Sequence, residues 1–312
     1  MQPISITAIA SLSPLGNDSS STWQTYLKGK PCFSLFDTVK GEVYAAQLNS
    51  ESKARVDALR QSDLKYKSLD NSVLFAILAS RDAVSAAGWD SAFGINLGSS
   101  RGATALFETH HKEFLESGKA HTLASPSTTL GNISSWVAHD LQQNGPEISH
   151  SITCSTALHA MLNAVAWLRA GMADKFLVGG SEAPLTSFTV AQMRALKIYS
   201  NETGEFPSRA SDFSKTKNSM ILGEGASVCC MEIGRKKNAI AMIEGMGYAT
   251  ELLKHGTSIS ANAECLQKSM RMALKNTSVG EIDAIVMHAP GTMAGDSTEL
   301  AAIQAVFGKN VP

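Results

Sequence analysis

The chain has 312 residues, of which 44% are hydrophobic and 18% are charged, and its formal net charge is −1. This length and apolar content allow a large buried core and more than one structural unit. The near-neutral charge gives no sign of a nucleic-acid-binding protein or an acidic tail, although a local basic patch stays compatible with it.

The cysteines indicate reduced thiols rather than a disulfide framework. They are odd in number, scattered, and contain no CxxC pair: Cys32, Cys154, Cys229, Cys230 and Cys265. This pattern supports neither disulfides nor a zinc site. The N-terminus lacks a basic region followed by a long apolar run, and no stretch reaches the ~18 consecutive apolar residues of a membrane span. We therefore expect a cytoplasmic protein without a signal peptide.

The first part of the chain alternates between strand-like and helix-like segments. In chain order, the patterns predict a strand over residues 4–10, a helix over 69–87, a strand over 93–97, a helix over 132–141, a strand over 147–152, a helix over 155–170, and strands over 175–180 and 226–231. Gly88 follows the first helix as a stop signal. The helix over 155–170 carries few charges, so we expect it to be buried nearly all round.

A second, shorter series of the same kind follows. It predicts a strand over residues 239–248, a helix over 261–275, a strand over 282–288, and a helix over 296–307 with Asp296 as its N-cap. Strands that alternate with helices predict the α/β class. We place a domain boundary near residue 236, which gives residues 1–236 and 237–312, and the repetition suggests two similar halves.

Cys154 is the strongest candidate nucleophile. It lies between a predicted strand that ends at Ile152 and a predicted helix that begins near Ser155. The start of a helix offers unpaired N–H groups and the positive end of the dipole, which lower a thiol pKa and can hold an oxyanion. A thiolate there can attack a thioester and store its acyl group. The alternative is a buried structural cysteine, and we prefer that interpretation for Cys229 and Cys230.

His288 is the second candidate. It ends a predicted strand and precedes the small, Gly-rich loop Ala-Pro-Gly-Thr-Met-Ala-Gly-Asp. Such a loop lets a substrate approach the backbone, and the imidazole can donate a hydrogen bond to a carbonyl or carry a proton. The alternative is a histidine whose ring is satisfied by the local backbone.

Five motifs in order carry a family resemblance. They are residues 13–17 with Trp23 and Leu27; Gly145-Pro146 with 151–156; 170–174 with 178–183; 222–226; and 288–296 with Glu299. Together, over nearly the whole chain, they resemble the β-ketoacyl synthases of the thiolase fold, the condensing enzymes of fatty-acid and polyketide synthesis. The resemblance implies a layered α-β-α-β-α fold of two similar halves, the second incomplete here.

The resemblance also implies a reaction. Cys154 would take an acyl group from the phosphopantetheine of an acyl carrier protein and condense it with a malonyl thioester by a decarboxylative Claisen reaction. His288 would hydrogen-bond the malonyl carbonyl, Thr292 would contact the pantetheine arm, and Glu224 and Glu299 would support loops. It implies no permanently bound cofactor or metal. The partners would be the carrier protein and a second synthase subunit, identical or related, with no nucleic acid or membrane.

Three departures from the family pattern indicate a divergent bacterial branch. Only 24 residues follow His288 and none is histidine, so the family's later K-x-x-x-G-H motif and Gly-Phe-Gly loop are missing. The chain as given would be a truncated or unfinished second half, or would work without that segment. The histidine loop has Ala289 and Pro290 in place of the family's Gly and Thr. Ser214 stands where the family has Asp. The pattern is similar to synthases of aryl-polyene or pigment pathways.

Two other functions remain open. Gly179-Gly180-Ser181-Glu182-Ala183 is close to the G-x-S-x-G elbow of a serine hydrolase, with Ala in the fifth position. A non-catalytic partner subunit that sets chain length, as some relatives do, is the second. For an acidic carrier protein, the lysines Lys65, Lys67 and Lys197 are candidate contacts or, equally, ordinary solvated side chains.

Overall fold

The computed structural model describes residues 2–129, 132–252, 260, 262–308 and 311–312. Two compact units form: unit 1 is Met1–Thr189 with Leu222–Met242, and unit 2 is Val190–Ile221 with Ile243–Pro312. The boundary near residue 236 divides the sequence rather than these compact units, and it stays a prediction.

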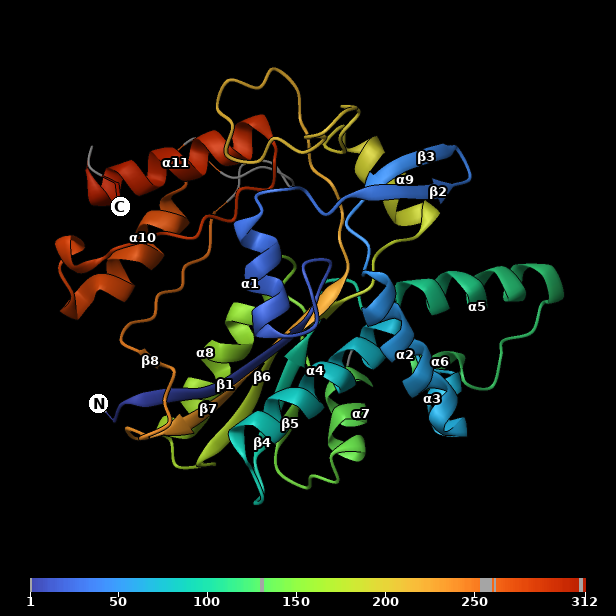
Figure 1. The fold of residues 1–312 in the computed structure, drawn as a ribbon, viewed down its shortest axis with the longest axis horizontal. Coiled ribbons are helices and arrows are strands. Elements are labelled where there is room, and N and C mark those ends of the chain that lie inside the picture. Colours follow the sequence, from blue (N-terminus) through green and yellow to red (C-terminus); the bar gives the residue numbers. More distant parts are fainter. Residues whose placement is uncertain (1, 130–131, 253–259, 261, 309–310) are drawn as a thin grey trace. The chain divides into compact units, whose positions relative to one another are not determined.

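Unit 1 is built on a six-stranded mixed sheet (Figure 1). The strand order is β5-β4-β6-β7-β1-β8. The strands are β1 (Ile4–Leu12), β4 (Gly94–Gly98), β5 (Glu147–Ile148), β6 (Lys175–Glu182), β7 (Gly225–Ile233) and β8 (Ala241–Ile243). β4 pairs parallel to β5 and β6, whereas β7 pairs antiparallel to β6 and β1. The predicted α/β class and the predicted strands β1, β4, β6 and β7 are confirmed.

The predicted strand over residues 147–152 is wrong beyond Ile148. The chain leaves the sheet there and enters a tight turn, in which the Ile152 N–H binds the Thr156 hydroxyl 2.9 Å away instead of a strand partner. Residues 239–248 likewise form only the three-residue strand β8.

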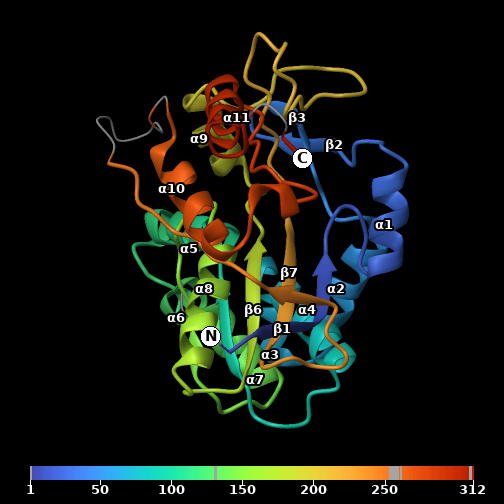
Figure 2. The ribbon, with the colours of Figure 1, turned by 90° about the vertical axis from the view of Figure 1, so that its left-hand side faces the viewer.

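Two helices cover opposite faces of the sheet. α4 (Asn71–Ala87) packs against β1, β6 and β7, and α8 (Thr156–Arg169) packs against β4, β6 and β7. Successive residues of a strand point to opposite faces. A Cβ at Gly180 would lie 3.2 Å from Ala157 of α8, whereas the next hydroxyl, Ser181, binds the Ser72 carbonyl of α4. Figure 2 shows the two helices on either side of the strands.

The first turn of α8 approaches the sheet closely because the strands carry glycine there. A Cβ at Gly98 would lie 2.2 Å from the Thr156 methyl carbon and 2.7 Å from the His150 carbonyl oxygen, which no side chain tolerates. The other flank of α8 stays uncovered, with Leu158 69% exposed. The prediction that this helix is buried nearly all round is therefore wrong, since only one side of it meets the sheet.

Shorter elements complete unit 1. The helices are α1 (Ser19–Leu27), α2 (Ser50–Ser62), α3 (Leu64–Lys67), α5 (Thr104–Ser117), α6 (Ala124–Thr128) and α7 (Asn132–Asp140), and a separate hairpin pairs β2 (Ser34–Thr38) with β3 (Gly41–Ala45). α9 (Ser187–Ala195) begins in unit 1 and ends in unit 2.

After Ile243, which ends β8, the regular elements that the structure describes in unit 2 are helices, joined by long irregular segments. α10 (Glu264–Ala273) packs against α11 (Met293–Phe307), and short 3-10 turns span Leu274–Asn276 and Val279–Glu281. The predicted strand over residues 282–288 is wrong. Those residues pair with no strand in the described part of the chain, and Val286 is 97% exposed. Residue 261, the predicted start of α10, lies outside the described residues.

Two further findings concern both units. Over the part that the structure describes, no helix is both long and apolar enough to span a bilayer. All five cysteines lie within that part, and none of them forms a disulfide.

Candidate active site

Cys154 lies on a tight turn that connects β5 to α8. The turn is closed by the Thr156 hydroxyl, which donates to the Thr153 carbonyl at 2.6 Å and accepts from the Ile152 N–H at 2.9 Å. Thr153 adopts the left-handed region, with φ of 44°. This conformation is unfavourable for a β-branched residue and costs on the order of 1–3 kcal/mol, so the surrounding bonds must hold it.

The same turn uses two of the amides that open α8. The Ser155 N–H binds the Ile152 carbonyl and the Thr156 N–H binds the Thr153 carbonyl, both at 3.2 Å. Cys154 therefore sits just before the N-cap residue Ser155, as predicted, but these two amides already have acceptors within the turn. These two amides are therefore not free to hold an oxyanion, although the sequence suggested that role for all the amides that open α8.

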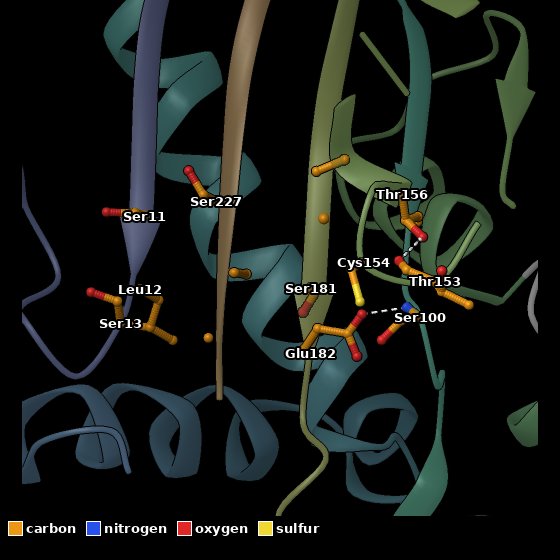
Figure 3. A pocket seen from close by; sticks show the side chains of 15 residues that line it. Ser11, Leu12, Ser13, Ser100, Thr153, Cys154, Thr156, Ser181, Glu182 and Ser227 are labelled. Atoms are coloured by element: carbon orange, nitrogen blue, oxygen red, sulfur yellow. Dashed lines mark hydrogen bonds between the residues drawn. The ribbon is translucent and has the colours of Figure 1, made fainter. Parts of the chain in front are cut away.

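Cys154 opens into a cavity of about 410 Å³ (Figure 3). All lining residues belong to unit 1. They come from the turn of residues 152–156, here called the nucleophile turn after the candidate nucleophile Cys154, from the start of α8, and from the ends of β1, β4, β6 and β7. The polar lining includes the hydroxyl-bearing residues Ser11, Ser13, Ser100, Thr153, Thr156, Ser181 and Ser227. An exposed thiol beside such a cavity can meet an acyl donor, and the alternative of a buried structural cysteine is wrong for Cys154.

Glu182 is a polar residue of this cavity that the sequence analysis did not single out. It ends β6, and its Oε1 accepts a hydrogen bond from the Ser100 N–H. The Ser100 carbonyl accepts from the Ser151 hydroxyl at 3.2 Å, so the backbone of Ser100 links the end of β6 to the segment that leads to Cys154. The two-residue period of the strand could have revealed this position, because Gly180 and Glu182 share a face.

The imidazole ring of His150 lies between Asn96 of β4 and the backbone of Thr156, the last residue of the turn. Its Nδ1 lies 3.1 Å from Asn96 Oδ1, and its Nε2 lies 3.2 Å from the Thr156 carbonyl oxygen. The Asn96 amide is oriented by its Nδ2, which donates to the Ala160 carbonyl at 3.3 Å. Burial lowers the pKa of His150 below its usual 6.5, although the Thr156 carbonyl acts in the opposite direction.

Ser181 does not form a nucleophile elbow. It lies within β6 rather than on a turn, is 1% exposed, and donates its proton to the Ser72 carbonyl at 2.6 Å. A G-x-S-x-G elbow needs an exposed serine between strand and helix, so this geometry contradicts the serine-hydrolase alternative.

The structural interpretation of the β7 cysteines agrees with their surroundings. Burial raises the pKa of Cys229 to about 12, and burial also raises the pKa of Cys230 well above its usual value. A thiol that resists ionisation is a poor nucleophile.

The histidine loop of unit 2 is held by Glu299. Its two carboxylate oxygens accept from the His288 N–H at 2.7 Å and from the Ala289 N–H at 2.8 Å. Ala289 is left-handed, with φ of 37°, and His288 is exposed. Glu299 thus supports the loop, as expected, and Glu224 similarly accepts from the Leu48 N–H at 3.0 Å in unit 1.

Asp296 fixes the far end of the same loop. It is fully buried, pairs with Lys215 at 2.7 Å, and accepts from the Gly291 N–H at 3.0 Å. The prediction that Asp296 caps α11 is wrong: the N-cap is Thr292, whose hydroxyl accepts from the Gly295 N–H at 3.1 Å. His288 and Thr292 therefore share one loop of unit 2, and Cys154 belongs to unit 1.

The fold of the chain is thiolase-like, and solved ketosynthases share it. The ishigamide ketosynthase/chain length factor superposes with a TM-score of 0.87 at 20% identity, over 100% of this chain and 79% of that one. A type II PKS ketosynthase, solved with its acyl-carrier protein and bound to the hexaketide, gives 0.82 at 20% identity over 99% and 78%.

The sequence comparisons identify the family. The family model of the β-ketoacyl synthase N-terminal domain matches residues 1–236, and that of the C-terminal domain matches residues 240–312. A 3-oxoacyl-[acyl-carrier-protein] synthase 2 of Staphylococcus aureus is 27% identical over 97% of this chain and 79% of that protein. The chain belongs to the β-ketoacyl synthase family.

Proposed function

We propose that this chain is a β-ketoacyl synthase that holds an acyl group on Cys154. The observation that carries the proposal is the exposed Cys154 at the start of α8, in a cavity of about 410 Å³. Family membership supports the same chemistry. The resulting ketoacyl products would serve fatty-acid, polyketide or aryl-polyene-type synthesis.

The reaction would run in two stages. In the first, Cys154 sulfur attacks the carbonyl of an acyl thioester; a new C–S bond forms, the old one breaks, and the pantetheine thiol leaves with the proton that Cys154 gave up. In the second, a malonyl thioester loses carbon dioxide, and its enolate carbon attacks the acyl group on Cys154. A C–C bond forms, the C–S bond to Cys154 breaks, and the Cys154 thiolate that leaves takes a proton from water.

His288 and Thr292 would act on the thioester that enters. An imidazole that donates a hydrogen bond to the malonyl carbonyl stabilises the enolate that develops on decarboxylation. The Thr292 hydroxyl accepts from the Gly295 N–H, so its own proton stays available to the pantetheine arm. Glu299 fixes the backbone on both sides of His288 and would set the position of its ring.

The partners would be an acyl carrier protein and a second synthase subunit. The carrier would deliver its phosphopantetheine as part of the substrate, with no cofactor bound permanently. A solved ketosynthase that carries its acyl-carrier protein supports this expectation. The uncovered flank of α8, with Leu158 69% exposed, is available to an identical or related subunit. The cytoplasm is the proposed location.

A non-catalytic partner subunit is the second candidate. A ketosynthase/chain length factor is among the structures that share this fold, and the histidine loop lacks the family's Gly and Thr at Ala289 and Pro290. Such a subunit would keep the fold and bind an active synthase without taking an acyl group.

Intact-protein mass spectrometry after incubation with an acyl-loaded carrier protein tests the two candidates. We expect one acyl adduct, located on Cys154 by peptide mapping, and none on the Cys154→Ala variant. Cys32→Ala is the matched control and should gain the same adduct as the native chain. Failure of the native chain to gain an adduct, alone and with a co-expressed synthase, would favour the non-catalytic role.

A further inference from the structure

Two consecutive residues, Asn218 and Ser219, hold the backbone on both sides of Thr292. Asn218 Oδ1 accepts from the Met293 N–H at 2.9 Å. The backbone N–H and the hydroxyl of Ser219 both donate to the Gly291 carbonyl, at 2.8 Å and 3.1 Å. All these residues belong to unit 2. The residue before Thr292 and the residue after it are therefore fixed by one short segment of the chain.

Gly291 allows this segment to approach the loop closely. Its φ is 81°, and a Cβ at this position would lie 3.1 Å from the Ser219 carbonyl oxygen. A side chain there would be strained by its backbone conformation and would also press on the backbone of Ser219. Ser219 itself is buried. The segment and the loop are therefore packed backbone against backbone at this point.

The end of α9 fixes the side chain of Asn218 in turn. Asn218 Nδ2 donates to the Lys197 carbonyl at 2.9 Å. Lys197 adopts the left-handed region, with φ of 58°, and its N–H donates to the Arg194 carbonyl at 2.9 Å. One partner of the Asn218 amide is a donor and the other is an acceptor, so a single orientation of the amide satisfies both. Neither a leucine nor an aspartate at this position could make both bonds.

The stability of α11 alone does not explain why Asn218 binds the Met293 N–H. This N–H is one of the first amides of the helix, which have no acceptor within it, and the Thr292 hydroxyl accepts from the Gly295 N–H instead. Met293 is exposed, so water could satisfy its amide. What Asn218 adds, from 75 residues earlier in the chain, is a fixed position for the start of the helix.

We infer that Asn218 is a positioning residue that sets the Thr292 hydroxyl for the pantetheine arm of the carrier protein, an inference that rests on the proposed function. Asn218 acts through the Met293 N–H and not on the substrate. With both of its neighbours held, Thr292 presents its hydroxyl in one place, and the proton stays available because the oxygen accepts from Gly295. The loop then loses less conformational entropy when the arm binds.

A purely structural role of Asn218 is the competing explanation. Its loss would then destabilise unit 2 and weaken all interactions of the carrier protein alike. The carrier protein itself separates the two roles. Its holo form carries the phosphopantetheine arm, and its apo form presents the same protein surface without the arm. A residue that acts on the contact with the arm changes the affinity for the holo form only.

The test measures the Kd of fluorescently labelled holo and apo carrier protein by anisotropy. We expect Asn218→Ala to raise the Kd of the holo form about five- to tenfold, as for one lost hydrogen bond, and to leave that of the apo form unchanged. Asn218→Asp keeps the acceptor for the Met293 N–H and should stay within about twofold of native. Thr216→Ala, an exposed neighbour, is the matched control and should bind both forms as the native chain does. Thermal unfolding midpoints establish that each variant is folded.

A double-mutant cycle tests the route through Thr292. Thr292→Val removes the hydroxyl and should also weaken binding of the holo form. Addition of Asn218→Ala to Thr292→Val should weaken it no further, because no hydroxyl is left to position. A further fivefold loss in the double variant would show that Asn218 acts elsewhere.

Three other results would overturn the inference. Equal weakening of the holo and apo forms by Asn218→Ala would assign Asn218 to the fold or to the carrier surface. An Asn218→Asp variant as weak as Asn218→Ala would show that the Met293 bond is not the route. A native chain that binds both forms equally would mean that Thr292 makes no contact with the arm.

Amide exchange decides the case in which Asn218→Ala does not fold. A Met293 amide that is protected in the native chain and in Asn218→Asp supports the inference, and one that exchanges like an unprotected amide refutes it. None of these measurements needs acyl transfer. The absence of an acyl adduct on Cys154, which would defeat the proposed function, is therefore a separate outcome.

Discussion

The nucleophile turn and the histidine loop both contain a residue of positive φ, and different kinds of hydrogen bond hold the two segments in place. Each places a non-glycine residue in the left-handed region directly beside its candidate catalytic side chain, Thr153 before Cys154 and Ala289 after His288. The nucleophile turn is closed by neutral hydrogen bonds within five residues, mainly through Thr156. The histidine loop is held by two carboxylates, and one of them pairs with a lysine 81 residues earlier in the chain.

This difference shows where each loop can be broken. A turn closed by its own residues tolerates changes elsewhere but depends on one hydroxyl. A loop held by a buried ion pair depends on a distant residue, and loss of one member leaves the other as an uncompensated buried charge. The following substitutions separate these two kinds of support.

Removal of Lys215 should have the largest effect. Its side chain is 3% exposed and that of Asp296 is fully buried, so Lys215→Met leaves a buried carboxylate without its cation. We expect a loss of about 3–5 kcal/mol in the free energy of unfolding, measured by urea titration, with faster amide exchange over residues 289–296. Two of the bonds of Asp296 to backbone N–H groups remain, which places the loss toward the lower value.

Lys268→Met is the control for this prediction. Lys268 pairs with Glu264 at 3.4 Å on the surface, where the two side chains are 66% and 62% exposed. Exposed pairs contribute about 0–1 kcal/mol, so this variant should unfold almost as the native chain does. Similar losses in both variants would mean that burial of the Lys215 pair is irrelevant to the loop.

Thr156→Val should have an intermediate effect confined to the nucleophile turn. Valine keeps the shape of the buried side chain but leaves the Ile152 N–H without its acceptor. We expect a loss of about 1–3 kcal/mol in the free energy of unfolding and slower acylation of Cys154. The Thr153 carbonyl would lose its 2.6 Å bond to the hydroxyl and keep only the 3.2 Å bond to the Thr156 N–H. Amide exchange over residues 289–296 should stay native.

Thr109→Val provides the comparison. That hydroxyl donates to the Ala105 carbonyl on the exposed side of α5, at 2.9 Å, so its loss should change stability by less than about 0.5 kcal/mol. An acylation rate unchanged by Thr156→Val would show that the turn does not need this hydroxyl to present Cys154.

The contrast between support from neighbouring residues and support from distant residues also explains how much of the fold could be predicted from sequence. β4, β6, α4 and the position of Cys154 before α8 follow from local apolar patterns and turn signals, and the structure contains them. The strand predicted over residues 282–288 failed because apolar alternation says nothing about whether a partner strand lies alongside. Asp296 resembled an N-cap by its place before a helix, and only its partner Lys215, far away in the sequence, explains its burial.

The prediction of the candidate site from sequence is limited in the same way, because part of the site depends on residues that are distant in the chain. A strand–cysteine–helix order indicates a nucleophile, since it depends on neighbours in the chain. The approach of Glu182 to the Cys154 cavity depends on how β4, β6 and the turn meet in space. Its sequence context, inside a Gly-Gly-Ser-Glu run, instead drew attention to Ser181, whose hydroxyl points to the other face.

The smallest expected effect is on the pH dependence of the nucleophile turn, through His150. Burial lowers the pKa of His150 in the folded chain below 6.5, its usual value when unfolded. The stability linked to the neutral ring is therefore fully present above about pH 6.5 and is lost as the pH falls through the folded pKa, because the unfolded chain binds the proton first. His150→Gln should remove this part of the decline, so that native and variant curves of unfolding free energy against pH converge or cross below pH 6.5.

His111→Gln, on the exposed surface of α5, controls for loss of a histidine and should keep the native slope. Parallel curves for native and His150→Gln from pH 7 to pH 5 would mean that the imidazole between Asn96 and Thr156 does not resist protonation. The contacts of His150 with Asn96 and Thr156 would then contribute to stability independently of pH, as the hydrogen bonds within the nucleophile turn do.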